Sequence, residues 1–133
     1  PQLLDEVASR FAYDSSIPTS GGLFPVPNNG CATARPFEIG ALLELPLSLP
    51  RDGSLRFLGY RPDEILDIWL SAAAMVAASG GVVVLLTHCE DRFTGSPAML
   101  SVYQRLLAAF AADDRYCFAL PRELVLDRDR EGL

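Results

Sequence analysis

The sequence predicts an α/β domain with a mainly parallel sheet, and three observations support this class. Residues 82–88 follow two glycines and begin with five apolar residues, which is typical of a strand buried on both faces. Segments with strand periodicity alternate with segments with helix periodicity, as they do in βα units. Half of the 133 residues are hydrophobic, which is enough to form a core. We therefore expect residues 1–133 to form a single domain.

The first part of the chain predicts a helix over residues 3–11, a short strand over residues 12–16 and a long loop over residues 17–36. Loops of that length border a binding cleft or wrap the surface, and both possibilities are open. Residues 39–49 alternate leucine with polar residues or proline, which predicts the next strand. Pro46 cannot donate a backbone hydrogen bond, so this strand lies at an edge or is bulged.

The second part predicts two long helices and two further strands. Residues 61–79 begin with a proline and acids, and they place Trp69 on an apolar face. The strand over residues 82–88 follows. Ser96 and Pro97 then begin a helix whose expected core face is Leu100, Tyr103, Leu106, Leu107 and Phe110. A short strand over residues 116–120 and a helical turn from Pro121 complete the predicted order.

Two polar residues stand directly after predicted strands. His88, the only histidine, ends the strand over residues 82–88, and Asp52 follows the strand over residues 39–49. In parallel α/β folds, functional residues lie just past the carboxyl ends of strands. His88 is therefore a candidate site residue. The alternative is a histidine that merely caps the end of a strand with a satisfied hydrogen bond.

Composition excludes several classes of function. The net charge is −6 and the 11 basic residues are all arginines without a basic stripe, so we expect no nucleic-acid partner. No apolar run is long enough to span a membrane. Cys31, Cys89 and Cys117 lack metal-site spacing, and Cys117 is expected in the core. Adjacent strand residues point to opposite faces, which argues against a nucleophilic pair of Cys89 and His88.

Three segments together resemble the C-terminal half of the polysaccharide deacetylase family, which acts on chitin, peptidoglycan and related N-acetylated sugars. Residues 11–16, Phe-Ala-Tyr-Asp-Ser-Ser, resemble the strand that follows the family's arginine-containing motif. Residues 42–52 resemble its next strand, an aliphatic-Glu-aliphatic-Pro segment that ends near an aspartate. Residues 83–88 are similar to its last motif, a hydrophobic strand that ends in Leu-x-His. The segments follow the family's order along nearly the whole chain.

The resemblance implies part of a distorted (β/α) barrel and a hydrolase that removes N-acetyl groups from amino-sugar polymers. In such an enzyme His88 would be the general acid that protonates the departing amine, and Asp52 would hold it charged and oriented. An imidazole suits this role because its ordinary pKa lies near ~6.5. Gly53 departs from the family pattern, in which a tryptophan often follows the aspartate.

The family also uses a divalent metal, often zinc, held by one aspartate and two histidines of its N-terminal half. This chain has one histidine and no Asp-Asp motif of that kind, so we expect it to bind no metal alone. It would then supply the general-acid half of a longer enzyme whose partner is an N-acetylated polysaccharide. The resemblance leaves the cell envelope and the cytoplasm both open as its location.

Two other functions stay open at this stage. The first is a degenerate, non-catalytic domain that binds carbohydrate or protein through the loop over residues 17–36 and exposed aromatic side chains. The second is catalysis by Cys89, which predicts a protein sensitive to alkylation.

Overall fold

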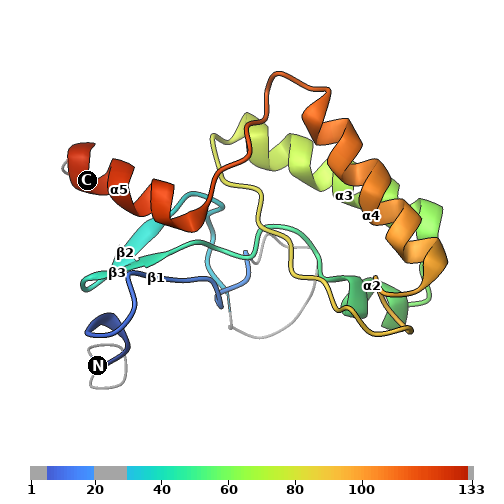
Figure 1. Cartoon of the computed structure of the whole chain (residues 1–133), viewed down its shortest axis with the longest axis horizontal. Helices are drawn as coiled ribbons and strands as arrows, with labels where there is room; N and C mark the ends of the chain where they lie inside the picture. Colours follow the sequence, from blue (N-terminus) through green and yellow to red (C-terminus); the bar gives the residue numbers. More distant parts are fainter. Residues whose placement is uncertain (1–5, 20–29, 132–133) are drawn as a thin grey trace.

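A computed structural model of the chain describes residues 6–19 and 30–131 (Figure 1). Its elements are β1 (Tyr13–Asp14), β2 (Phe37–Ile39), β3 (Leu42–Glu44), α2 (Asp52–Phe57), α3 (Pro62–Ala78), α4 (Pro97–Ala111) and α5 (Pro121–Glu131). Residues 6–8 are helical, whereas the start of the helix predicted over residues 3–11 lies outside the described residues. Residues 20–29 of the predicted long loop also lie outside them.

The three strands form one mixed sheet in the order β1-β3-β2. β1 runs parallel to β3, with Asp14 opposite Glu44, and β2 runs antiparallel to β3. The chain turns between β2 and β3 at Gly40, whose φ of 63° favours glycine. The single strand predicted over residues 39–49 is therefore wrong, because the chain reverses within it.

The prediction of part of a distorted (β/α) barrel with mainly parallel strands is also wrong. The described residues form one small mixed sheet and no barrel. Residues 82–88 do not form a strand, because a side chain interrupts the ladder that they would need. The Ser48 hydroxyl donates to the Val82 carbonyl (2.7 Å) and accepts from the Val84 N–H (2.8 Å), and the Ser48 and Leu49 N–H groups both donate to the Val84 carbonyl.

The strand predicted over residues 116–120 is absent as well. Cys117 and the rest of this segment beyond Tyr116 are exposed, so the expectation that Cys117 lies in the core is wrong. The segment instead leads into α5, where the Glu123 carboxylate accepts the Leu120 N–H at 2.6 Å, as a residue near a helix N-terminus often does. α5 continues to Glu131, well beyond the single turn predicted.

The main core lies between α3 and α4, which run side by side in Figure 1. Trp69 is wholly buried there, as predicted. The buried face of α4 consists of Met99, Val102, Leu106 and Phe110, whereas Leu100 and Leu107 are exposed. The helical period of α4 was predicted correctly. The predicted core face was partly wrong, because several adjacent residues of this helix are apolar and the sequence does not show which of them are buried.

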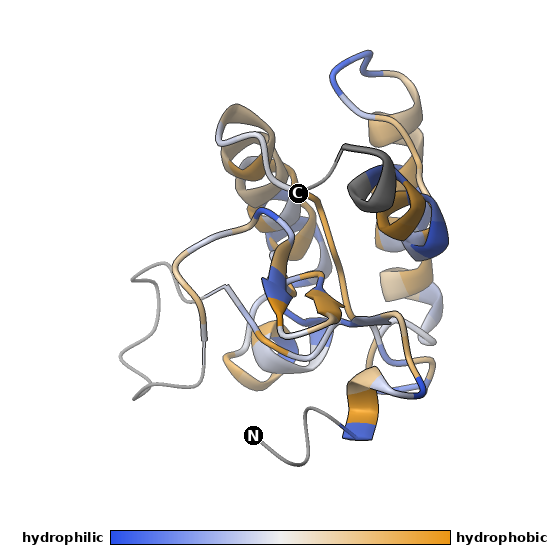
Figure 2. Ribbon diagram, turned by 90° about the vertical axis from the view of Figure 1, so that its left-hand side faces the viewer, coloured by the Kyte–Doolittle hydropathy of each residue, from blue (hydrophilic) through white to orange (hydrophobic). Residues whose placement is uncertain are grey.

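A second core cluster lies between the sheet and α5. Figure 2 shows hydrophobic and hydrophilic residues together on α5, and its Leu124 and Val125 pack with Leu43, Leu45 and Val84. α5 therefore covers one face of the sheet. None of the helices in the described part of the chain combines the length and the apolar character that a membrane crossing requires.

Candidate acid–base site

Asp52 lies in the first turn of α2 rather than at the end of a strand. The preceding residue, Arg51, is extended with φ −65° and ψ 144°, and the helix begins directly after it. A carboxylate in a first turn is favoured because the free backbone N–H groups there carry partial positive charge. The Trp69 indole N–H donates to the Pro50 carbonyl at 2.7 Å. This hydrogen bond holds the segment that precedes Asp52 against the main core.

Asp52 and His88, the two predicted site residues, are in direct contact. Asp52 Oδ1 lies 2.6 Å from His88 Nδ1, and Asp52 Oδ2 accepts the His88 backbone N–H at 2.9 Å. Asp52 therefore fixes both the ring of His88 and its backbone. The Asp52 side chain is 0% exposed, whereas that of His88 is 36% exposed. The buried partner thus holds a histidine that reaches the surface.

Thr94 and Gly53 complete the shell around the Asp52 carboxylate. Oδ2 accepts hydrogen bonds from the Thr94 hydroxyl at 2.7 Å and from the Thr94 backbone N–H at 3.1 Å. Oδ1 accepts a hydrogen bond from the Gly53 N–H at 2.7 Å. A buried carboxylate is tolerated when donors satisfy its oxygens in this way. Sequence reasoning missed Thr94, because one threonine in a polar loop carries no distinctive signal.

The hydrogen bonds to Asp52 set its ionisation. Burial by itself would raise the pKa of the Asp52 carboxyl. The donors from His88, Thr94 and Gly53 stabilise the charged form, and the pKa is lowered overall from its ordinary value of 3.8. Asp52 is thus an ionised acceptor at neutral pH, so the proton between it and His88 belongs to Nδ1.

This arrangement leaves the other ring nitrogen for chemistry. No hydrogen bond joins His88 Nε2 to any residue within the described ranges. A neutral His88 with its proton on Nδ1 presents a lone pair at Nε2, and a charged His88 presents a proton there. The pair can therefore accept or deliver a proton through Nε2 at a surface that is partly open to solvent.

The loop that carries His88 and Thr94 is closed by tight local contacts. The Phe93 ring lies 5.1 Å from the His88 ring, centroid to centroid, and is tilted by 47°. The Phe93 N–H donates to the Glu90 carbonyl at 2.9 Å. Gly95 packs against the Cys89 carbonyl so closely that a Cβ would overlap it. This packing orders the segment that faces Asp52.

The site shows neither a thiol contact with His88 nor a cluster of metal ligands. Cys89 is exposed, and no hydrogen bond among the described residues joins it to His88. Across residues 6–19 and 30–131, no three side chains of histidine, cysteine, aspartate or glutamate converge as metal ligands. The Asp52 oxygens are also occupied by hydrogen-bond donors. These residues therefore do not fit the divalent metal that the resemblance implies.

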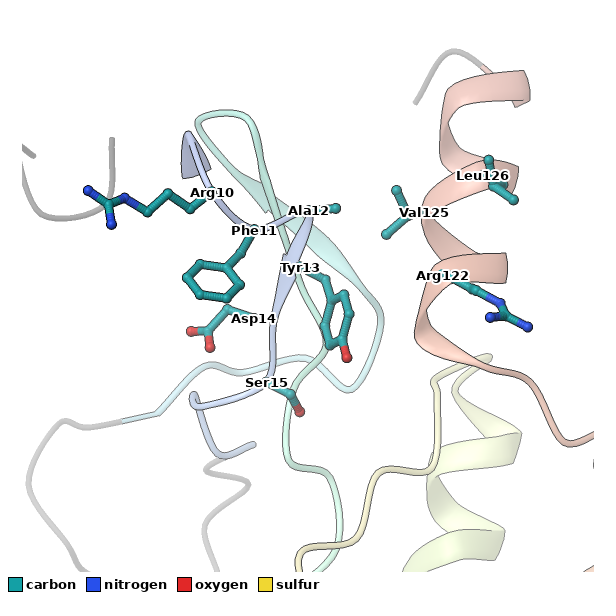
Figure 3. Close-up of a pocket in the computed structure, with 9 residues that line it drawn as sticks. All are labelled: Arg10, Phe11, Ala12, Tyr13, Asp14, Ser15, Arg122, Val125 and Leu126. Carbon is teal, nitrogen blue, oxygen red and sulfur yellow. The ribbon is translucent and has the colours of Figure 1, made fainter. Parts of the chain in front are cut away.

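Two cavities lined by described residues lie away from the Asp52–His88 pair. The larger, about 580 Å³, lies between β1 and α5 (Figure 3). The other, about 560 Å³, lies between the N-terminal turns of α3 and α4. Neither is lined by Asp52 or His88.

No known family model, curated protein or solved structure matches this chain significantly. The resemblance to polysaccharide deacetylases therefore stays a prediction, carried by the three segments described above.

Proposed function

We propose that His88 is the general acid–base residue of a hydrolase that removes N-acetyl groups from amino-sugar polymers, and that Asp52 positions it. The proposal rests on the 2.6 Å contact between Asp52 Oδ1 and His88 Nδ1, made by a carboxylate that is itself wholly buried. The choice of substrate rests on the resemblance of residues 11–16, 42–52 and 83–88 to deacetylase motifs.

Amide hydrolysis needs a proton on the departing amine nitrogen, because an unprotonated amide anion is a poor leaving group. A charged His88 delivers this proton from Nε2 and returns to the neutral form with its other proton still on Nδ1. The ionised Asp52 holds the orientation of the ring throughout the transfer. Proton transfer by a positioned residue typically contributes about 10²–10⁴-fold in rate. Neither residue acts as a metal ligand in this role.

The test is acetate release from N-acetylglucosamine oligomers and from peptidoglycan by the full protein that contains this chain. His88→Gln should lower kcat by about 10²-fold or more, because glutamine cannot exchange a proton at neutral pH. Asp52→Asn should also lower kcat, since an amide can donate to Nδ1 and so reverse the tautomer. The matched control is Glu90→Gln, an exposed residue of the same loop. Wild-type turnover in His88→Gln would overturn the assignment.

A second candidate function is carbohydrate binding without turnover, and the larger cavity favours it. Phe11 is 61% exposed and Tyr13 is 41% exposed, and both line this cavity; the Tyr13 ring points toward α5, whereas the Phe11 and Asp14 side chains lie on the other side of β1 (Figure 3). Exposed aromatic faces are suited to the apolar surfaces of a sugar. Binding of N-acetylglucosamine oligomers without acetate release, weakened by Phe11→Ala and unaffected by His88→Gln, would favour this function over catalysis.

A further inference from the structure

A second pair of carboxyl groups lies on the sheet, apart from Asp52 and His88. Asp14 of β1 and Glu44 of β3 occupy the same register position on adjacent parallel strands. Side chains alternate between the faces of a strand, and the neighbours Leu43 and Leu45 pack with Val125 of α5. Glu44 therefore points to the face of the sheet opposite α5, together with Asp14.

Glu44 is an unusual residue for a sheet interior. It is 0% exposed. Its Oε1 accepts the Ile17 N–H at 2.9 Å, whereas Oε2 is buried with no hydrogen-bond donor among the described residues. The Asp14 carboxyl stands opposite Glu44 in the sheet register, and its charge raises the pKa of the Glu44 carboxyl. Asp14 Oδ2 in turn accepts the Ser16 hydroxyl at 2.5 Å. The buried Oε2 atom is thus left without a donor among the described residues.

Two ionised carboxylates in contact are disfavoured, and an unpaired buried acceptor adds a further cost. One proton removes both difficulties, because a protonated carboxyl donates through its O–H. We propose that Glu44 keeps a proton at pH values where an exposed glutamate is ionised and donates it from Oε2 to Asp14, so that the two residues form a pH-sensitive clasp between β1 and β3. This inference is independent of the function proposed for His88.

The charges around the clasp agree with this assignment. Burial and the negative charge of Asp14 raise the pKa of the Glu44 carboxyl above its ordinary value of 4.5, against a smaller lowering by backbone N–H groups. β2 places Phe37 opposite Glu44. Its only acidic residue, Glu38, is opposite Leu43.

Within residues 6–19 and 30–131, neither of the two arginines that line the larger cavity forms an ion pair with Asp14 or Glu44. Arg10, which lines the larger cavity with Asp14, forms its ion pair with Glu6 at 3.4 Å. Arg122 of α5 lines the same cavity, but α5 covers the face of the sheet opposite Glu44.

The clasp predicts a specific dependence of stability on pH. Because the folded pKa of Glu44 is raised, its contribution to stability is complete below pH 4.5 and is lost as the pH rises through the folded pKa. Ionisation would then place two negative charges between β1 and β3 and weaken their pairing. Glu44→Gln should remove this loss, since glutamine accepts from Ile17 through its oxygen and donates to Asp14 through its amide at any pH.

The decisive experiment is a pH titration of the wild-type protein with ¹³C-labelled glutamate carboxyl groups, in which the Glu44 signal is assigned by its absence from Glu44→Gln. We expect the Glu44 carboxyl to titrate above 4.5. A Glu44 signal that titrates at or below 4.5 would overturn the proposal.

A cation site is the competing explanation of the same carboxyl pair. Thermal unfolding with and without Ca²⁺ or Mg²⁺ separates the two. A rise in Tm on adding the ion to the wild type but not to Glu44→Gln would show a bound cation in place of the proton and would also overturn the proposal. An equal response of both proteins supports the clasp.

Discussion

The hydroxyl of Thr94 offers a sharp test of how the acid–base site is held together. Thr94→Val keeps the shape of the side chain but removes the 2.7 Å hydrogen bond to Asp52 Oδ2. A hydrogen bond to a charged group contributes about 1.5–3 kcal/mol. The Thr94 backbone N–H still reaches the same oxygen at 3.1 Å, so we expect a loss near the lower end, about 1.5–2 kcal/mol of unfolding free energy.

Urea unfolding at pH 7 measures this loss, and Thr94→Ser is the matched control. Serine retains the hydroxyl and gives up one methyl group, which costs less than about 1 kcal/mol. A loss below about 0.5 kcal/mol in Thr94→Val, or an equal loss in both variants, would refute the view that the hydroxyl stabilises a buried carboxylate.

The loss of stability in Thr94→Val should depend on pH in a direction that the pKa of Asp52 sets. The folded pKa of Asp52 is lowered, so the stability that its hydrogen bonds contribute is present above pH 3.8 and is lost as the pH falls through the folded pKa. Removing the Thr94 hydroxyl shifts the pKa of Asp52 back towards 3.8. The difference in stability between the wild type and Thr94→Val should therefore shrink in acid. A difference that grows as the pH falls below 3.8 would contradict the reasoning.

Three further variants probe the surroundings of the site. Trp69→Phe removes the 2.7 Å hydrogen bond to the Pro50 carbonyl and leaves a small void. Thermal unfolding should show a loss of about 2–4 kcal/mol in unfolding free energy. A loss below about 1 kcal/mol would count against the role of this hydrogen bond. Gly95→Ala should disrupt the loop, since its Cβ would overlap the Cys89 carbonyl, and a near-native Tm would argue against that packing. Gly53→Ala should be tolerated or gain up to about 1 kcal/mol, because its Cβ would meet the nearest imidazole carbon at 3.4 Å; a clear loss on urea unfolding would contradict this.

The two long helices α3 and α4 were predictable because each has a local signal, whereas α2 was not predicted. Pro62 and the acids after it begin α3, and Ser96 with Pro97 begins α4, where Ser96 Oγ accepts the Met99 N–H at 3.4 Å. Trp69 was placed in the core for the same reason, a position on a periodic apolar face. Periodicity and caps depend on nearby residues, so the sequence carries them directly.

The sheet was not predictable, because pairing depends on residues far apart in the chain. The apolar run over residues 82–88 predicts a strand buried on both faces, but these residues are only partly buried or exposed, with Leu86 39% exposed. Whether the run joins a ladder depends on the side chain of Ser48, 34 residues before Val82. The turn at Gly40 was likewise not predicted, because the alternation over residues 39–49 is what a single strand would show. The barrel prediction failed for this reason.

The contact of Asp52 with His88 was expected, but the secondary structure that positions the two residues differs from the prediction. Both residues were placed after strands, whereas Asp52 begins a helix and the segment before His88 is not a strand. The clasp of Asp14 and Glu44 carried no sequence signal, since Glu44 alternates with leucines as an exposed strand residue would. Their roles in chemistry stay predictions.

The most direct test of the central claim is the protonation of the His88 ring, measured by ¹⁵N NMR on the ring-labelled protein above the pH at which His88 loses its charge. Asp52 accepts at Nδ1, so the neutral ring should carry its proton on Nδ1 and leave Nε2 bare. Asp52→Asn should shift the proton towards Nε2. A wild-type ring that is protonated on Nε2, or that populates both tautomers equally, would contradict the claim that Asp52 holds His88 ready to exchange protons at its exposed nitrogen.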